Sequence, residues 1–136
     1  MRQKVLIVED DHDLRRMFST VLALAGFDTE EAQDAFHALH RLDQEKPTAI
    51  VLDLGLPRVS GYVVLQEVVA QAHLREIPVL IVTGQPGAEL PDGAACLLRK
   101  PVMPDQLVSA VRRCILEGGA SAPTTAEATR DRFSEP

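Results

Sequence analysis

The sequence predicts an α/β fold, a single doubly wound parallel sheet with helices on both faces. Three short apolar runs, at residues 5–8, 49–52 and 79–82, each end at a polar residue and have the continuous hydrophobicity of strands buried on both faces. Segments with apolar residues at helical spacing alternate with these runs. Because crossovers between parallel strands are right-handed, such alternation places helices on both sides of one sheet.

The remaining elements follow from apolar patterns that lie between turn residues. In chain order, we expect a helix at 14–25, a weak edge strand at 27–32, a helix at 35–42 with Phe36 and Leu39 facing inward, a helix at 62–72, a fifth strand at 96–98 and a helix from Pro104 to about Gly118. Gly26 ends the first helix, and Pro104 suits the first turn of the last one. Strands and helices therefore alternate along the chain, except in one interval.

That interval, at residues 84–95, lacks a helical pattern. It contains Pro86, Gly87, Pro91 and Gly93. A helix there would need about ten residues without an interior proline, because proline removes a backbone donor and clashes with the preceding turn. We therefore predict that the fourth helix of the fold is missing or cut to one turn.

Length, composition and charge limit the classes of protein to consider. The 136 residues suit one domain at 1–118, followed by a disordered tail at 119–136 that is poor in apolar residues. The net charge of −6 argues against a nucleic-acid-binding surface, which needs clustered Lys and Arg. Neither a membrane span nor a signal-peptide pattern is present, so we expect a cytoplasmic protein without membrane contact.

The cysteines and the paired histidines do not suggest metal sites. Cys96 and Cys114 lie in apolar stretches without a metal-ligand spacing, which favours buried thiols over a disulfide or ligands. His37 and His40 are three residues apart on one predicted helix, as in some metal sites, but no third ligand accompanies them. Solvent-exposed helix positions are the favoured interpretation of this pair.

Polar residues follow four of the predicted strands. Glu9 and Asp10 end the first run, Asp53 the second and Thr83 the third, and Lys100 comes after the fifth strand. The carboxyl ends of parallel strands meet at one edge of the sheet, where functional groups collect. We therefore expect these five side chains to share one site.

The chemistry of this set indicates phosphoryl transfer assisted by a metal ion. Carboxylates brought close together repel each other unless a divalent cation lies among them, and Mg²⁺ prefers oxygen ligands. We predict Mg²⁺ held by Asp10, Asp53, a water on Glu9 and the backbone carbonyl of Gly55. With a lysine ammonium and a threonine hydroxyl opposite, Asp53 is placed to accept a phosphoryl group.

Single residues of this region also have simpler explanations. Asp11 or Asp13 would simply cap the following helix in this interpretation. Taken alone, Lys100 is an ordinary solvated lysine and Thr83 a hydroxyl at a strand end. The functional interpretation depends on their joint placement, with one group at each strand end.

Four segments resemble, in order, the signature blocks of response-regulator receiver domains: VEDDHDLRR, VLDLGLPRVSGY, VLIVTG and LLRKP. The similarity spans about residues 3–117 and implies a flavodoxin-like strand order of 2-1-3-4-5. It implies that Glu9, Asp10 and Asp53 bind Mg²⁺, and that Asp53 takes a phosphoryl group from the phosphohistidine of a histidine kinase or phosphotransfer protein. Thr83 and Lys100 would contact that phosphoryl group.

The resemblance carries further expectations and two departures. It implies a cis bond between Lys100 and Pro101, and a role for Gly55 and Gln85 in tuning dephosphorylation. Receiver domains usually have an aromatic residue three positions before the lysine, where this chain has Leu97. The interval between the threonine and the lysine is also about five residues shorter than the family pattern.

We therefore expect a phosphorylation switch that is not an enzyme beyond its own phosphorylation and dephosphorylation. Its read-out would be binding to an output protein that the sequence does not identify. One alternative is a degenerate receiver that acts only as a protein-binding module. Another is an aspartyl-nucleophile phosphohydrolase, which usually has a second Asp two residues after the nucleophile, where this chain has Gly55.

Overall fold

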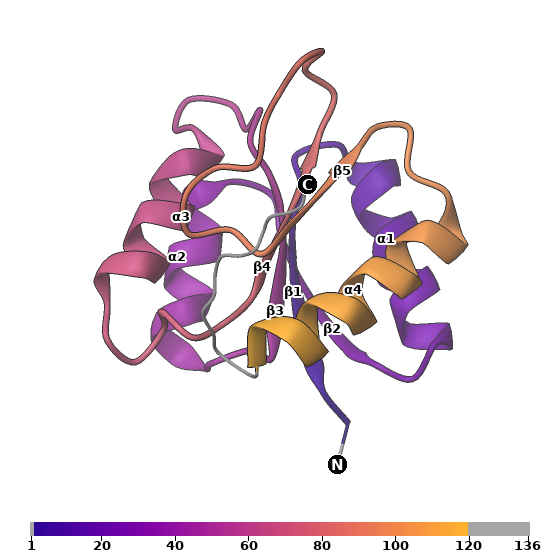
Figure 1. The fold of residues 1–136 in the computed structure, drawn as a ribbon, viewed down its shortest axis with the longest axis horizontal. Helices are drawn as coiled ribbons and strands as arrows, with labels where there is room; N and C mark the ends of the chain where they lie inside the picture. Colours follow the sequence, from indigo (N-terminus) through magenta and orange to yellow (C-terminus); the bar gives the residue numbers. More distant parts are fainter. Residues whose placement is uncertain (1, 120–136) are drawn as a thin grey trace, which may run out of the picture.

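A computed structural model of the chain describes residues 2–119 (Figure 1). It contains five strands and four helices among these residues. In chain order they are β1 (Lys4–Val8), α1 (His12–Leu24), β2 (Asp28–Ala32), α2 (Ala35–Gln44), β3 (Ala49–Asp53), α3 (Gly61–Ala70), β4 (Val79–Thr83), β5 (Cys96–Arg99) and α4 (Pro104–Gly119). Of the tail expected at 119–136, Gly119 is the last residue of α4, and residues 120–136 lie outside the described residues.

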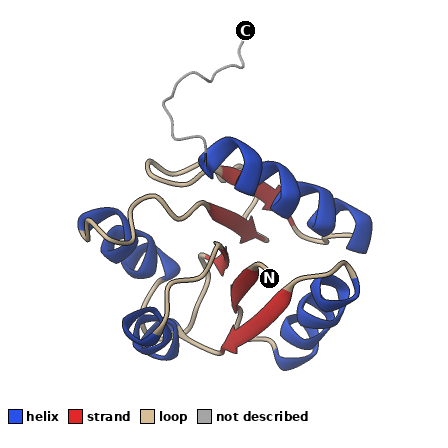
Figure 2. Ribbon diagram, turned by 90° about the horizontal axis from the view of Figure 1, so that it is seen from below, coloured by secondary structure: helices blue, strands red, loops and turns tan. Residues whose placement is uncertain are grey.

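The five strands form one parallel sheet in the order β2-β1-β3-β4-β5, as the resemblance to receiver domains implies. Helices α1 and α4 cover one face of the sheet, and α2 and α3 cover the other (Figure 2). The chain therefore has the predicted doubly wound architecture, in which all five strands end at the same edge.

Each face of the sheet has its own apolar core. Leu6, Leu52 and Ile81 point to the side of α2 and α3, whereas Ile7 and Val51 point to the side of α1 and α4. Strands β3 and β4 are buried along their whole length. This explains why they read as continuous apolar runs in the sequence.

Short polar side chains begin three of the helices. Asp11 accepts a hydrogen bond from the Leu14 amide at the start of α1, and Ser60 accepts one from the Tyr62 amide at the start of α3. Asp34 caps α2 in the same way. These contacts satisfy amides that lack a partner within the helix. They also settle which of the two candidate aspartates caps α1.

Two expectations need correction. Phe36 does not face inward, because its side chain is 60% exposed on α2. The described residues contain four helices, the last of which is α4, so the prediction of a missing fourth helix is wrong.

Residues 84–95, between β4 and β5, consist of loop and turns, with Gly87 and Gly93 at φ of 76° and 91°. Glycine adopts these angles without the strain of a side chain.

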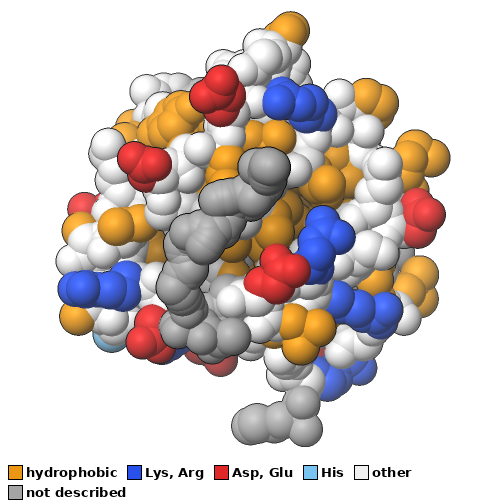
Figure 3. All heavy atoms as spheres, in the orientation of Figure 1, with side chains coloured by type: hydrophobic (Ala, Val, Ile, Leu, Met, Phe, Trp, Pro, Cys, Tyr) orange, Lys and Arg blue, Asp and Glu red, His pale blue; other side chains and the backbone are white. Residues whose placement is uncertain are grey.

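The surface mixes apolar and charged side chains. Figure 3 shows hydrophobic side chains on the face that carries β5 and α4, between charged residues of both signs. Leu90 and Met103 are among the larger exposed apolar residues, at 50% and 56%. Within residues 2–119, none of the helices combines the length and the apolar character needed to cross a lipid bilayer.

Candidate functional site

The carboxyl ends of the strands bring the five predicted side chains together. They line a shallow hollow of about 380 Å³ at this edge of the sheet. Its lining residues are Glu9, Asp10, Asp11, Asp53, Gly55, Thr83, Gly84, Gln85 and Lys100. Segments as distant in the sequence as residues 9 and 100 thus contribute to one site, because parallel strands end side by side.

Three carboxylates form the centre of this hollow. Glu9, Asp10 and Asp53 each place a carboxylate oxygen within 4.8 Å of the others. Glu9 and Asp53 are 1% and 6% exposed, whereas Asp10 is open to solvent. Like charges at this separation and burial repel each other, so the cluster requires positive charge nearby.

Lys100 supplies one such charge. Its Nζ lies 3.0 Å from Glu9 Oε1 and 3.3 Å from Asp53 Oδ2. Partial burial lowers the pKa of Lys100, but the hydrogen bond to Glu9 and the charges of Asp53 and Glu9 outweigh it and raise the pKa overall. The ammonium group therefore stays charged between two carboxylates. The Lys100–Pro101 peptide bond is cis, as the resemblance to receiver domains implies.

Both carboxylate oxygens of Glu9 have a partner. Its Oε2 accepts a hydrogen bond from the Asp11 amide at 3.1 Å, and the Lys100 ammonium lies 3.0 Å from its buried Oε1. Burial, together with the charge of Asp53, raises the pKa of the Glu9 carboxyl against the opposing effect of Lys100. A buried carboxylate is costly unless a cation or a donor satisfies its oxygens, and the Lys100 ammonium is the cation beside Oε1.

This donor set fits a hard divalent cation. It offers carboxylate oxygens only, from three residues, with one side open for water, as Mg²⁺ sites require. The Gly55 amide donates a hydrogen bond to Asp53 Oδ1 at 2.9 Å, which orients that carboxylate. The Gly55 carbonyl therefore stays a prediction as a metal ligand.

Thr83 ends β4 beside the carboxylates and is 1% exposed. Its Oγ1 accepts a hydrogen bond from the Gln85 amide at 3.1 Å, and both residues line the hollow. The hydroxyl hydrogen remains available to donate to a group bound there. Thr83 thus lies where a hydrogen-bond donor to a phosphoryl oxygen is expected.

Sequence reasoning missed two residues that support this site. Arg15 is 8% exposed and donates to the Glu9 carbonyl at 2.9 Å and to Glu31 Oε1 at 3.0 Å, which holds the end of β1 in place. A Cβ atom at Gly61 would lie 2.2 Å from the Asp53 carbonyl oxygen. The tandem Arg15-Arg16 was a visible signal, but no local pattern marks Gly61 as a point of contact.

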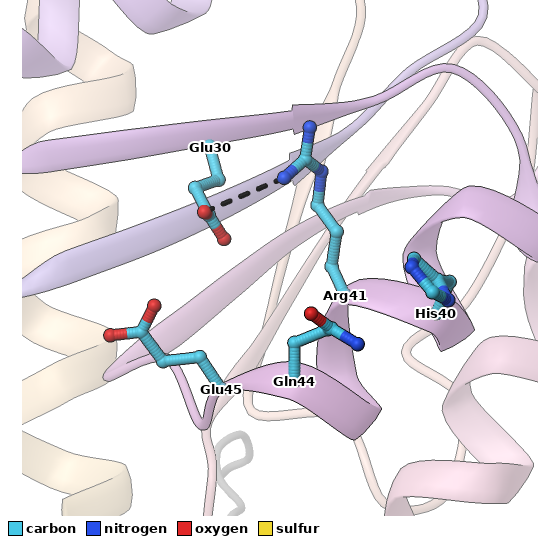
Figure 4. A pocket seen from close by; sticks show the side chains of 5 residues that line it. All are labelled: Glu30, His40, Arg41, Gln44 and Glu45. Carbon is cyan, nitrogen blue, oxygen red and sulfur yellow. Dashed lines mark ion pairs between the residues drawn. The ribbon is translucent and has the colours of Figure 1, made fainter.

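A wider hollow of about 560 Å³ lies away from this site, at the outer edge of the sheet. It is lined by Glu30, His40, Arg41, Gln44 and Glu45 (Figure 4). Glu30 and Arg41 form an ion pair of 3.5 Å across it. Its charged groups are already paired at the surface, so it has the character of an ordinary polar groove.

The chain is similar to several regulatory proteins. It is 32% identical over 117 residues to the phosphate regulon transcriptional regulatory protein PhoB of Escherichia coli, covering 82% of this chain and 51% of the relative. It is 32% identical over 122 residues to a probable transcriptional regulator, ycf27, of Galdieria sulphuraria, covering 85% and 46%. The chain thus spans about half the length of the curated relatives it matches.

Two solved structures share the fold over almost their whole length. The chemotaxis response regulator CheY4 of Vibrio cholerae matches with a TM-score of 0.78 at 28% identity, covering 84% of this chain and 99% of that one. A putative response regulator of Chloroflexus aurantiacus matches with a TM-score of 0.80 at 27% identity, covering 86% and 100%. Residues 5–112 match the profile of the response regulator receiver domain. The chain therefore belongs to the response-regulator receiver domain family of two-component signalling proteins.

Proposed function

We propose that the chain is a phosphorylation switch in which Asp53 accepts a phosphoryl group, with Mg²⁺, from the phosphohistidine of a histidine kinase or a phosphotransfer protein. The observation that carries the proposal is the position of Lys100. Its ammonium group lies within 3.3 Å of Asp53 Oδ2 and 3.0 Å of Glu9 Oε1, beside the Thr83 hydroxyl. A nucleophilic carboxylate, a fixed cation and a donor are the parts that phosphoryl transfer needs.

Each residue of the site has a distinct role in the proposed phosphoryl transfer. A carboxylate oxygen of Asp53 forms a bond to phosphorus while the bond from phosphorus to the donor's imidazole nitrogen breaks. Lys100 offsets charge on the phosphoryl oxygens, and Thr83 donates a hydrogen bond to one of them. Glu9 and Asp10 would hold Mg²⁺, which, when bound, offsets the charge of the carboxylates and of the phosphoryl group. The Gly55 amide keeps the Asp53 carboxylate in a fixed orientation.

Two alternatives receive less support from the same residues. A phosphohydrolase with an aspartyl nucleophile needs an acid or base near the leaving group, and Gly55 has no side chain to provide it. A protein-binding module without phosphorylation does not need a buried, charged cluster, which is costly to maintain. We therefore propose no enzymatic activity beyond the chain's own phosphorylation and dephosphorylation.

The proposed read-out is contact with another protein in the cytoplasm. The net charge of −6 disfavours direct contact with nucleic acid by this domain, although the PhoB and ycf27 relatives are named as transcriptional regulators. Leu97 replaces the usual aromatic residue, and residues 84–95 form a loop. We propose that surfaces outside residues 85–98 take part in the response. Amide exchange with and without beryllofluoride would contradict this if only residues 85–98 changed.

Intact mass spectrometry tests the proposal. The full chain is incubated with acetyl phosphate, with and without Mg²⁺, and a gain of one phosphoryl mass is expected only with Mg²⁺. Asp53→Ala should gain nothing, whereas Asp43→Asn, at an exposed position on α2, should behave as the wild type. Absence of an adduct in the wild type would favour the protein-binding module. Turnover of unrelated phosphoesters would favour the phosphohydrolase.

A further inference from the structure

The two cysteines of the chain lie in direct contact. Cys96 begins β5 and Cys114 lies in α4, elements that pack against each other (Figure 1). Their Sγ atoms are 2.7 Å apart, and both cysteines are free thiols. A disulfide bond is about 2.05 Å long, so an approach of about 0.7 Å would bring the sulfurs to bonding distance. The sequence predicts two buried thiols but not this contact, because 18 residues separate them.

The two thiols differ in their access to solvent. Cys114 is 1% exposed and belongs to the apolar core beneath α4. Cys96 is only partly buried, at the margin of the same core. A reagent from solvent therefore reaches Cys96 first.

The contact also makes the two thiols chemically unequal. The close contact with the Cys114 thiol, together with the charge of Arg113, lowers the pKa of Cys96 against the effect of burial. The same contact, together with burial, raises the pKa of Cys114. The thiolate is the reactive form of cysteine, so Cys96 is the better nucleophile of the pair.

A metal site is a poorer explanation of the pair. Within residues 2–119, the one group of three or more potential ligands that lie together is Glu9, Asp10 and Asp53, at the far end of the strands. The two thiols therefore have no third ligand near them, whereas structural zinc sites use four.

We propose that Cys96 and Cys114 form a redox site, which closes to an intramolecular disulfide by exchange with a low-molecular-weight disulfide such as oxidised glutathione. In the first step, the Cys96 thiolate attacks the small disulfide, forms a mixed disulfide and releases one thiolate. Cys114 then attacks Cys96 Sγ and expels the second thiolate, which takes the proton that Cys114 loses. Two protein thiols are oxidised, and one small disulfide is reduced to two thiols.

The bond would fasten β5 to α4. It closes a loop that contains Lys100, which follows β5 directly. A crosslink across such a loop removes conformations from the unfolded chain and stabilises the folded one. The oxidised protein is therefore expected to unfold at a higher temperature than the reduced one.

The experiment uses the full chain in glutathione buffers of increasing oxidised fraction. Intact mass should show a loss of two hydrogen masses, and peptide mapping without reductant should join Cys96 to Cys114. The oxidised protein should remain monomeric on a non-reducing gel, and Tm should rise by about 5 °C or more. A wild-type chain that keeps both thiols in fully oxidised glutathione, carries a stable glutathione adduct or forms linked dimers would overturn the proposal.

Two variants test the order of events. Cys114→Ala removes the resolving thiol, so a glutathione adduct should accumulate on Cys96. Cys96→Ala leaves only the buried thiol, and the folded protein should take up no adduct. Circular dichroism shows whether each variant folds. The wild-type measurement decides the proposal even if either variant does not fold. An adduct on Cys114 in folded Cys96→Ala would contradict the assigned order.

Discussion

Lys100 is the residue that compensates the charge of the carboxylate cluster. We predict that Lys100→Ala lowers the rate of phosphorylation by acetyl phosphate about 100-fold, because the charge that develops on the phosphoryl oxygens loses its fixed cation. The rate is measured by intact mass over time in saturating Mg²⁺. Lys46→Ala removes an exposed lysine elsewhere and should leave the rate unchanged. A Lys100→Ala rate within threefold of the wild type would contradict the assigned role.

Gly61 allows α3 to begin close to the end of β3. A Cβ there would lie 2.2 Å from the Asp53 carbonyl oxygen, which belongs to the rigid backbone of β3. We predict that Gly61→Ala destabilises the fold by about 2 kcal/mol, because the start of α3 must move away. Gly55→Ala is the matched control, since its Cβ meets Asp53 Oδ1 at an ordinary 3.6 Å. Urea unfolding compares the two, and equal midpoints would refute the close contact.

Some of these residues are predictable from sequence, and others are not. The five site residues lie at the ends of apolar strands, and parallel strands bring such residues together however the helices pack. They are Glu9, Asp10, Asp53, Thr83 and Lys100. Contacts between elements depend instead on how helices lie on the sheet. The steric limit at Gly61 and the contact of the two thiols are such contacts between a helix and a strand. The spacing of apolar residues along the sequence does not predict them.

At the scale of elements, the cap of α2 also anchors the loop that follows β3. Asp34 Oδ1 accepts a hydrogen bond from the His37 amide at 2.9 Å, and Asp34 Oδ2 pairs with Arg58 Nη2 at 2.9 Å. Arg58 lies in that loop with a φ of 64°. The His37 amide and ring, followed by the Arg58 charge, lower the pKa of Asp34 despite its burial.

This shift predicts a pH dependence of stability. The folded state holds the Asp34 proton less tightly than the unfolded state, where the ordinary pKa is 3.8. Its contribution is complete above that value and is lost as pH falls through the lower folded pKa. Asp34→Asn keeps a cap but not the charge, so it should cost about 1 kcal/mol at pH 7.

Urea unfolding of wild type and Asp34→Asn from pH 7 to pH 2 checks this prediction. The difference between the two should be constant above about pH 5 and should shrink below about pH 4. Asp43→Asn, on the same helix but exposed, controls for the loss of one negative charge. A difference that grows as the pH falls would contradict the proposed role of Asp34.

The elements themselves were largely predictable because the period of apolar residues differs between strands and helices. The exposed Phe36 shows the limit of that reasoning, since a single aromatic residue at helical spacing does not identify the buried face. Alanines and a leucine fill the corresponding core instead, at Ala35, Ala38 and Leu42. Strand order is not contained in the apolar pattern, because doubly wound sheets occur in more than one order, and it came from the resemblance to receiver domains.

At the scale of the whole molecule, we predict that the carboxylate cluster links stability to Mg²⁺. Repulsion among Glu9, Asp10 and Asp53 destabilises the folded chain, and a cation that binds only the folded state reverses this. We predict that Mg²⁺ at ten times its Kd raises the free energy of unfolding by about 1.4 kcal/mol. Asp10→Asn should raise Tm without Mg²⁺ and abolish the response to it. Equal Mg²⁺ responses in both proteins would argue against this metal site.

The central claim is that Asp53, and no other residue of the cluster, receives the phosphoryl group. Borohydride reduces an acyl phosphate on an aspartate to homoserine, which marks the acceptor for peptide mass mapping. After treatment with acetyl phosphate and Mg²⁺, we predict homoserine at residue 53 and unmodified Glu9 and Asp10. A reduced side chain at residue 9 or 10, or no homoserine in any peptide of a chain that gains a phosphoryl mass, would contradict this account.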